Sequence, residues 1–224
     1  LGVPSKHAEK VMKEIYDGYN QPYVITDRES AEMIKYASND FLALKISYVN
    51  EIANLCELVG ADVQDVTRGM GMDARIGNKF LQAGIGYGGS CFPKDTKALS
   101  WLASFNDYEI KTVKAAIEVN ENQKLKLIKK SRKYYDSLEG LTVAVLGLTF
   151  KPNTDDLRES PSFTNIPILL DDGAIVKAYD PIGENNFKKY YPNEITYCST
   201  IEDTLKDADL CLILTEWNEI KQLD

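Results

Sequence analysis

The feature that most restricts how this chain can fold is one helical pattern that continues from Asp27 to Val59. Gly60 is placed to end this helix. Leu42 and Ile46 lie on nearly the opposite side from its main apolar stripe, so we expect much of the helix to be enclosed. A helix this long and buried is typical of the spine of a helical domain or of a dimer interface. The main stripe consists of Met33, Ile34, Ala37, Phe41, Leu44, Tyr48, Val49, Ile52 and Val59.

Other helical patterns and a glycine-rich loop surround the long helix. Thr26 and Glu29 have the spacing of a capping box at its start. The segment 84–90 has four glycines within six residues, so we expect it to be a loop. The other expected elements are helices over 8–16, 62–68, 78–82 and 108–135, a helix beginning near Pro93, and a short strand over 23–25.

At Gly140 the pattern changes from helices to strands that alternate with helices. The run LTVAVLGL, over 141–148, is typical of a buried strand. Because each strand is followed by a helix, we expect a parallel, doubly wound sheet. The remaining elements are helices over 160–170 and 201–206 and strands over 174–179 and 210–214.

The predicted fold class is therefore α/β, with two different parts in one chain. We expect an all-helical central domain over 27–137, followed by a doubly wound, Rossmann-like domain over 138–224. Residues 1–26 are too short to build a sheet of their own, and we interpret them as the tail of a preceding domain. We expect the chain to be a fragment that is truncated at both ends.

Composition excludes several classes of function. The chain has 34 acidic and 26 basic residues, and this net charge of −8 argues against binding nucleic acid or an anionic membrane. No apolar run is long enough to span a bilayer and no leader is present, so we expect a soluble, cytoplasmic protein. The four cysteines form no CxxC pair, so we expect free thiols in a reducing compartment and no metal site.

Cys91 is the strongest candidate for chemistry, because of the residues around it. Pro93 suits the first position of a helix, which would place Cys91 just outside the positive end of the helix dipole. With Lys94 nearby, this setting favours a thiolate nucleophile. Asp95 is close enough in sequence to act on a group bonded to the sulfur. An ordinary unpaired cysteine is the alternative interpretation.

Lys35 and Asn39 are one helical turn apart, so they share a face with apolar Leu42 and Ile46. They are either a partly buried polar pair suited to hydrogen bonding or a solvated lysine beside an asparagine. The backbone N–H groups of the loop 84–89 could hold phosphate or sugar, although a plain flexible loop is an equal alternative.

Lys151 and Arg158 follow the first strand of the predicted sheet, where doubly wound folds bind their ligands. Only Gly147 is present there, so the G-x-G-x-x-G pattern of a dinucleotide site is absent. The two cations offer charge for a phosphate, or they are ordinary charges of a surface loop.

Three stretches together resemble the UDP-glucose/GDP-mannose dehydrogenase family. They are SAEMIKYASNDFLALKISYVNEIANLCE at 30–57, DARIGNKFLQAGIGYGGSCFPKDTKAL at 73–99 and LGLTFKPNTDDLRESPS at 146–162. The combination of GGSCFPKD with KYASN is far more specific than either motif. The resemblance implies oxidation of the C6 hydroxyl of a UDP-sugar to a carboxylate, in two steps that use NAD.

The resemblance also implies roles for individual residues. Cys91 would attack the intermediate aldehyde and form a thiohemiacetal and then a thioester, while Lys35, Asn39 and Asp95 would stabilise the oxyanion and position water. Substrate would contact Arg75, Phe80, Gly84, Tyr87, Gly88 and Lys151. Lys94 and Arg158 would contact NAD, and the long helix would form a homodimer that lets Arg75 reach the partner's substrate.

Ser90, where relatives acting on N-acetylmannosamine have histidine, favours the UDP-glucose branch of the family. The alternatives are a UDP-N-acetylmannosamine or GDP-mannose dehydrogenase, or a non-catalytic dimerisation fragment that binds a sugar nucleotide. A β-hydroxyacid dehydrogenase is disfavoured because it needs neither Cys91 nor the domain at 140–224. The family's N-terminal NAD-binding domain has no counterpart here, so we expect this chain to be inactive by itself.

Overall fold

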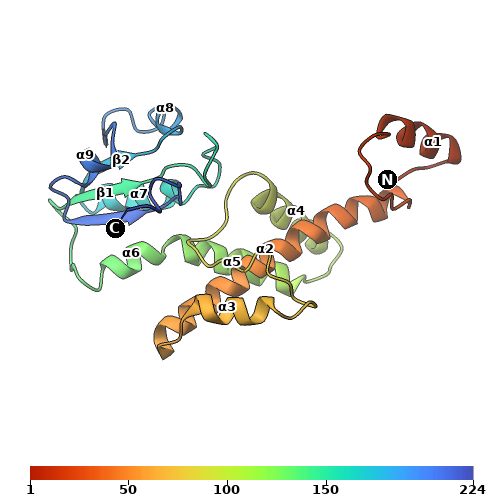
Figure 1. Ribbon diagram of the computed structural model, residues 1–224, viewed down its shortest axis with the longest axis horizontal. Helices are drawn as coiled ribbons and strands as arrows, with labels where there is room; N and C mark the ends of the chain where they lie inside the picture. The colour runs from red at the N-terminus through yellow and green to blue at the C-terminus, as the bar shows by residue number, and fades with distance from the viewer. Residues whose placement is uncertain (224) are drawn as a thin grey trace.

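The computed structural model describes residues 1–223 as a helical half followed by a sheet half. Figure 1 shows α1 and the sheet at opposite ends of an elongated molecule, with α2 to α6 between them. The predicted fold class is confirmed, since a helical region precedes a parallel α/β sheet. The helices of the first half are α1 (Lys6–Ile15), α2 (Arg28–Val59), α3 (Val63–Gly71), α4 (Cys91–Phe105), α5 (Lys111–Lys124) and α6 (Lys126–Ser131).

The long helix α2 ends as predicted but is capped by a different residue. Gly60 adopts the left-handed conformation, with φ of 76°, and its N–H donates to the Cys56 carbonyl. At the start, Asp27 rather than Thr26 is the N-cap, and its carboxylate accepts from Ser30 N–H at 2.6 Å. Thr26 is instead in a bridge to Gly2.

The expected enclosure of α2 is wrong for much of its apolar stripe. Helices α4 and α5 pack on the side that carries small and polar residues such as Ala43, Ser47 and Asn50, which are fully buried. Within one chain, Phe41 and Val59 of the stripe remain 62% and 68% exposed. Helical periodicity places residues on a common face, but it does not say which face another element covers.

Three expected elements of the helical half are wrong. Residues 23–25 form no strand, because only the single bridge at Thr26 pairs this segment. Residues 78–82 form no helix, because Phe80 has φ of 61°, outside the right-handed helical region. The helix over 108–135 starts later and is divided at Leu125, whose N–H bonds to the Asn122 carbonyl three residues back.

The sheet half has the predicted parallel topology, with strand order β3-β2-β1-β4. Two short elements, α8 and β3, are not apparent from the sequence. The elements are β1 (Thr142–Leu146), α7 (Ser162–Asp171), β2 (Ile175–Tyr179), α8 (Glu184–Phe187), β3 (Thr196–Tyr197), α9 (Ile201–Leu205) and β4 (Leu210–Ile213).

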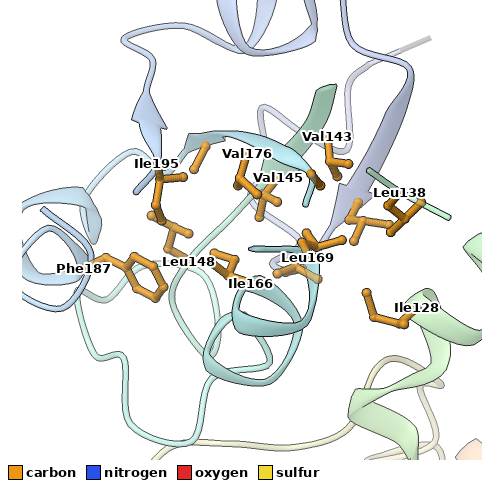
Figure 2. Packing of buried hydrophobic residues seen from close by; sticks show 14 of the residues in the cluster. Ile128, Leu138, Val143, Val145, Leu148, Ile166, Leu169, Val176, Phe187 and Ile195 are labelled. Atoms are coloured by element: carbon orange, nitrogen blue, oxygen red, sulfur yellow. The ribbon is translucent and has the colours of Figure 1, made fainter. Parts of the chain in front are cut away.

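Helices cover both faces of this sheet. On one face, Ile166 and Leu169 of α7 point toward Val145 of β1 and Val176 of β2, and Figure 2 shows this packing. On the other face, Leu146 packs with Ile201 of α9 and with Trp217 and Ile220 near the end of the chain. Adjacent residues of β1 therefore serve opposite layers, as strand alternation requires. Within residues 1–223, no helix is both long and apolar enough to cross a membrane.

The loop after β1 is held at the carboxyl edge of the sheet by Asp180. This buried carboxylate accepts hydrogen bonds from the N–H groups of Leu148 at 2.7 Å, Thr149 at 3.2 Å and Gly183 at 2.6 Å. Gly147 begins the loop with φ of 91°, and a Cβ there would lie 2.6 Å from the Thr215 nitrogen. Only glycine combines this backbone with so close a neighbour.

We therefore predict that Gly147→Ala lowers the free energy of unfolding by about 3 kcal/mol, since it adds a backbone clash to left-handed strain. Gly140→Ala is the matched control. Gly140 also has positive φ but faces open space, so its substitution should cost only about 1 kcal/mol. Urea unfolding of both variants measures the difference, and equal losses would show that the Thr215 contact is unimportant.

Candidate functional site

Cys91 is the first residue of α4, not a residue outside it as predicted, and its side chain is exposed. Pro93 is accordingly the third helical residue, a position where its missing N–H is still no loss. Ser90, the N-cap, makes no side-chain capping hydrogen bond. The free N–H groups of the first turn therefore lie beside the thiol and favour negative charge there.

Asp95 lies one turn further along α4 and gathers three other predicted site residues. Its carboxylate is 1% exposed and accepts from Lys35 Nζ at 2.8 Å, from Lys94 Nζ at 2.6 Å and from the Asn39 amide. Burial opposes ionisation of Asp95, but these hydrogen bonds outweigh it and lower the pKa of Asp95 to about 2. The result is a fixed carboxylate with two ammonium groups close to Cys91.

The two lysines of this cluster remain accessible. The side chain of Lys35 is 60% exposed, which agrees with the alternative of a solvated lysine rather than with that of a partly buried pair. Leu42 and Ile46, the apolar residues that share its face, are themselves only partly buried. The pKa of Lys94 is raised, mainly by its hydrogen bond to Asp95 and more weakly by charge attraction to Cys91. Both ammonium groups can therefore meet a ligand from the open side of the site.

Asp40, which follows Asn39 on α2, is a buried carboxyl that sequence reasoning missed. It is 4% exposed and neither of its oxygens has a hydrogen-bond partner. Burial, together with repulsion from Asp95, raises the pKa of Asp40 to about 6. An aspartate in a helical stretch normally faces water, so the sequence around Asp40 did not indicate that this residue is buried.

The glycine loop at 84–89 is held by amide side chains of α2 and α5. Asn120 clamps Tyr87 from both sides: its Oδ1 accepts from the backbone N–H at 2.7 Å and its Nδ2 donates to the carbonyl at 3.1 Å. Gly84 is held in the same way, by Asn50 at 2.8 Å and Gln123 at 2.7 Å. The loop is therefore fixed, contrary to the alternative of a plain flexible loop.

These amide residues were not predicted as part of the site. Asn120 and Gln123 occupy buried positions one turn apart on α5, and Asn54 supports Gln123 with a hydrogen bond at 2.9 Å. Amides spaced at helical intervals and facing inward are the signal that could have found them, because a buried amide requires polar partners.

Phe80 and Tyr87 meet the helix next to Cys91. Their rings pack edge-on against Phe92, with ring centroids 6.1 Å and 5.7 Å from it. Arg75 lies apart from these residues, with an 89% exposed side chain that pairs only with Asp73 at 2.6 Å. The structure thus brings Phe80 and Tyr87 to the site, but it does not bring Arg75 there within one chain.

The glycine loop also contacts the sheet half directly. Gly89 N–H donates to the Arg158 carbonyl at 2.8 Å, and a Cβ on Gly88 would lie 2.4 Å from the Glu159 carbonyl oxygen. Glu159, with φ of 54°, also binds Lys97 at 2.9 Å and the buried Lys124 at 3.0 Å. This junction places the loop that carries Lys151 and Arg158 against the start of α4.

A cleft of about 1160 Å³ opens at this junction, between the two halves. Lys94 and Ser90 line it from the helical side, and Arg158 and Thr154 line it from the sheet side. Lys151 lies outside the cleft lining, with its ammonium 5.3 Å from the centre of the Phe150 ring. The Arg158 guanidinium pairs with Asp156 at 2.7 Å. Cationic groups from both halves can thus hold an anionic ligand here.

Comparisons with known proteins identify this architecture. Two family models match the chain: the central domain of the UDP-glucose/GDP-mannose dehydrogenase family over residues 29–122 and the UDP binding domain of the same family over residues 144–224. The chain belongs to the UDP-glucose/GDP-mannose dehydrogenase family.

The chain is also similar to individual proteins of known name. The chain is 47% identical to UDP-glucose 6-dehydrogenase TuaD of Bacillus subtilis (strain 168), covering 100% of this chain and 49% of that protein. A UDP-glucose dehydrogenase of Pyrobaculum islandicum has a TM-score of 0.96 at 36% identity, with 100% of this chain and 52% of that chain covered. A UDP-D-ManNAc dehydrogenase of Pyrococcus horikoshii has a TM-score of 0.82 at 25% identity, with 100% of this chain and 51% of that chain covered. The chain spans about half the length of these relatives.

We predict that Asn120→Ala destabilises the chain by about 2–3 kcal/mol, because it leaves the buried N–H and C=O of Tyr87 without partners. Hydrogen exchange at Tyr87 should become faster as well. Asn122→Ala on the same helix is the control, since its exposed amide bonds only to the Glu118 carbonyl, and it should change stability by less than about 0.5 kcal/mol. Equal effects of the two substitutions would contradict the clamp.

Proposed function

We propose that this chain is the catalytic and UDP-sugar-binding half of an NAD-dependent UDP-glucose 6-dehydrogenase, which oxidises UDP-glucose to UDP-glucuronate. The observation that carries the proposal is the exposed Cys91 at the start of α4, beside a buried carboxylate that holds two lysines. The relatives named UDP-glucose dehydrogenase are more similar in sequence than the UDP-D-ManNAc dehydrogenase, at 47% and 36% against 25% identity. Ser90 before Cys91 favours the same substrate.

In the proposed chemistry, the Cys91 thiolate attacks the aldehyde carbon formed by the first oxidation and makes a C–S bond. The carbonyl electron pair moves to the oxygen, and Lys35 and Asn39 stabilise that charge. Loss of hydride from this carbon gives a thioester, and attack by water then releases the carboxylate and returns the thiol. Asp95, ionised because its pKa is about 2, accepts a hydrogen bond from the attacking water.

Two NAD⁺ molecules, bound in turn, would each accept one hydride. The residues that fit NAD on this chain are Lys94 and Arg158, which line one cleft from opposite sides and suit a dinucleotide's phosphates. The relatives are about twice as long as this chain, so we propose that the other half of the complete protein binds most of the cofactor. By this proposal, the chain alone binds a UDP-sugar but does not reduce NAD.

The substrate is proposed to lie between the glycine loop and Lys151. The N–H groups of Gly84 and Tyr87 are bonded to Asn50 and Asn120, so the loop offers the N–H groups of Ile85, Gly86 and Gly88 instead. Phe80 and Tyr87 lie beside this loop, and Lys151 supplies charge for the pyrophosphate. We also propose a homodimer through α2 and α3, where Leu58 and Met72 are 82% and 84% exposed. Arg75 would then reach the partner's substrate. The four free cysteines support a reducing compartment such as the cytoplasm.

We expect UDP-glucose to bind this chain in a calorimetric titration and UDP-N-acetylmannosamine to bind more weakly. Lys151→Ala should weaken binding about tenfold, because it removes a charged partner of the pyrophosphate. Lys129→Ala, which removes an exposed lysine on α6, should leave the affinity unchanged. Equal affinity of the unmodified chain, Lys151→Ala and Lys129→Ala would show that Lys151 is not part of the site.

In the complete protein, Cys91→Ala should abolish oxidation of UDP-glucose, by about a thousandfold or more, without loss of UDP-glucose binding. Cys211→Ala is the control: it removes the other exposed thiol, on β4, and should leave the rate unchanged. Both rates are measured from the absorbance of the reduced cofactor at roughly 340 nm. Activity retained in Cys91→Ala would exclude covalent catalysis by this thiol.

A further inference from the structure

Asp40 is a buried ionisable residue without a hydrogen-bond partner among the described residues, and the proposed chemistry leaves it unused. It lies next to Asn39 on α2, faces the side covered by α4 and α5, and has no hydrogen-bond partner for either oxygen. A fully buried carboxylate without a partner is strongly unfavourable unless a cation is near or a proton is bound. Tyr87 OH is also buried without a partner among the described residues, and the charge of Asp40 contributes to raising the pKa of this phenol. The active-site wall therefore contains two unsatisfied polar groups.

The charges that act on Asp40 come from two helices. Lys35 on α2 stabilises its ionised form, and Asp95 on α4 opposes ionisation. From the glycine loop, Tyr87 stays neutral at ordinary pH, since burial raises the pKa of its phenol to about 12. Helix α5, which also packs on α2, carries Glu121 and Lys124, and these pair with each other at 3.0 Å. Lys35 is paired with Asp95 at 2.8 Å and acts on Asp40 through its charge, with no ion pair between Lys35 and Asp40 among the described residues.

We infer that Asp40 is a positioning residue whose protonation state sets the net charge around Lys35, Lys94 and Asp95. With Asp40 protonated, the two ammonium groups of Lys35 and Lys94 outweigh the single carboxylate of Asp95, and the cluster carries one net positive charge. With Asp40 ionised, the charges of these four groups sum to zero. The protonated form therefore favours negative charge on a bound oxyanion or on Cys91, and the ionised form favours it less.

This inference rests on the proposed function for its meaning, but its physical content does not need substrate or NAD. Asp40 and Asp95 have environments that push their ionisation in opposite directions, which is the arrangement that separates two neighbouring carboxyl groups into different protonation states. The isosteric change Asp40→Asn removes the titration and leaves the volume unchanged.

The test is a carboxyl carbon NMR titration of aspartate-labelled chain. Asp40 should titrate near pH 6, as the raised pKa of its buried carboxyl requires, and the Asp95 signal should respond at the same pH. Lys35→Met, a change at an exposed side chain, should raise the Asp40 midpoint, and Asp95→Asn should lower it. A midpoint that neither substitution moves would overturn the inference. So would an Asp40 that titrates like an exposed aspartate, at about pH 4.

A second readout reports the effect on Cys91. At pH 7.5, a value about one to two units above the Asp40 midpoint, Asp40→Asn should react with iodoacetamide about threefold faster at Cys91, because a negative charge is gone. Cys211 on β4 is the internal control and should react at the same rate in both proteins. Equal Cys91 rates would overturn the inference. Absence of UDP-glucose binding, with both readouts as predicted, would instead count against the proposed function alone.

Discussion

The close approach of the Gly88–Gly89 backbone to Glu159 is the contact on which the rest of the site depends. No side chain fits at Gly88, since a Cβ would lie 2.4 Å from the Glu159 carbonyl oxygen. The same contact gives Gly89 N–H its partner, the Arg158 carbonyl, and Glu159 is anchored in turn by the buried Lys124. Because the loop leads directly into Cys91, this junction fixes the thiol relative to the cations of the sheet half.

Two carboxyl groups in different environments give the site its electrostatic character. Asp95 is buried but supplied with three donors, so it remains ionised and gathers Lys35 and Lys94 next to Cys91. Asp40 is buried without donors to offset the effect of burial, so its pKa is raised to about 6. The pKa values of Asp40 and Asp95 differ because of hydrogen bonding rather than depth of burial alone. A buried anion that holds two exposed ammonium groups suits a reaction in which negative charge appears on a substrate oxygen.

Much of the fold could be predicted from sequence because it depends on local patterns. The apolar periodicity of α2, the Gly60 cap and the alternation of strands and helices after Gly140 are all encoded over short ranges. Motif resemblance also predicted the residues that meet around Asp95. The exposed stripe of α2 and the burial of Asp40 could not be predicted, since each depends on which element packs against which face. The prediction of a helix at 78–82 is wrong because Phe80 adopts a left-handed conformation there.

The most direct test of the junction is UDP-glucose binding by Gly88→Ala. If one site spans both halves, the added methyl group must push the glycine loop away from Glu159, and affinity should fall by about tenfold or more while the chain stays folded. Gly140→Ala is the control outside the proposed site, because a Cβ there has no neighbour within 4 Å, and it should bind normally. Unchanged affinity in Gly88→Ala would contradict the account, since it would mean that the ligand does not depend on the contact between the halves.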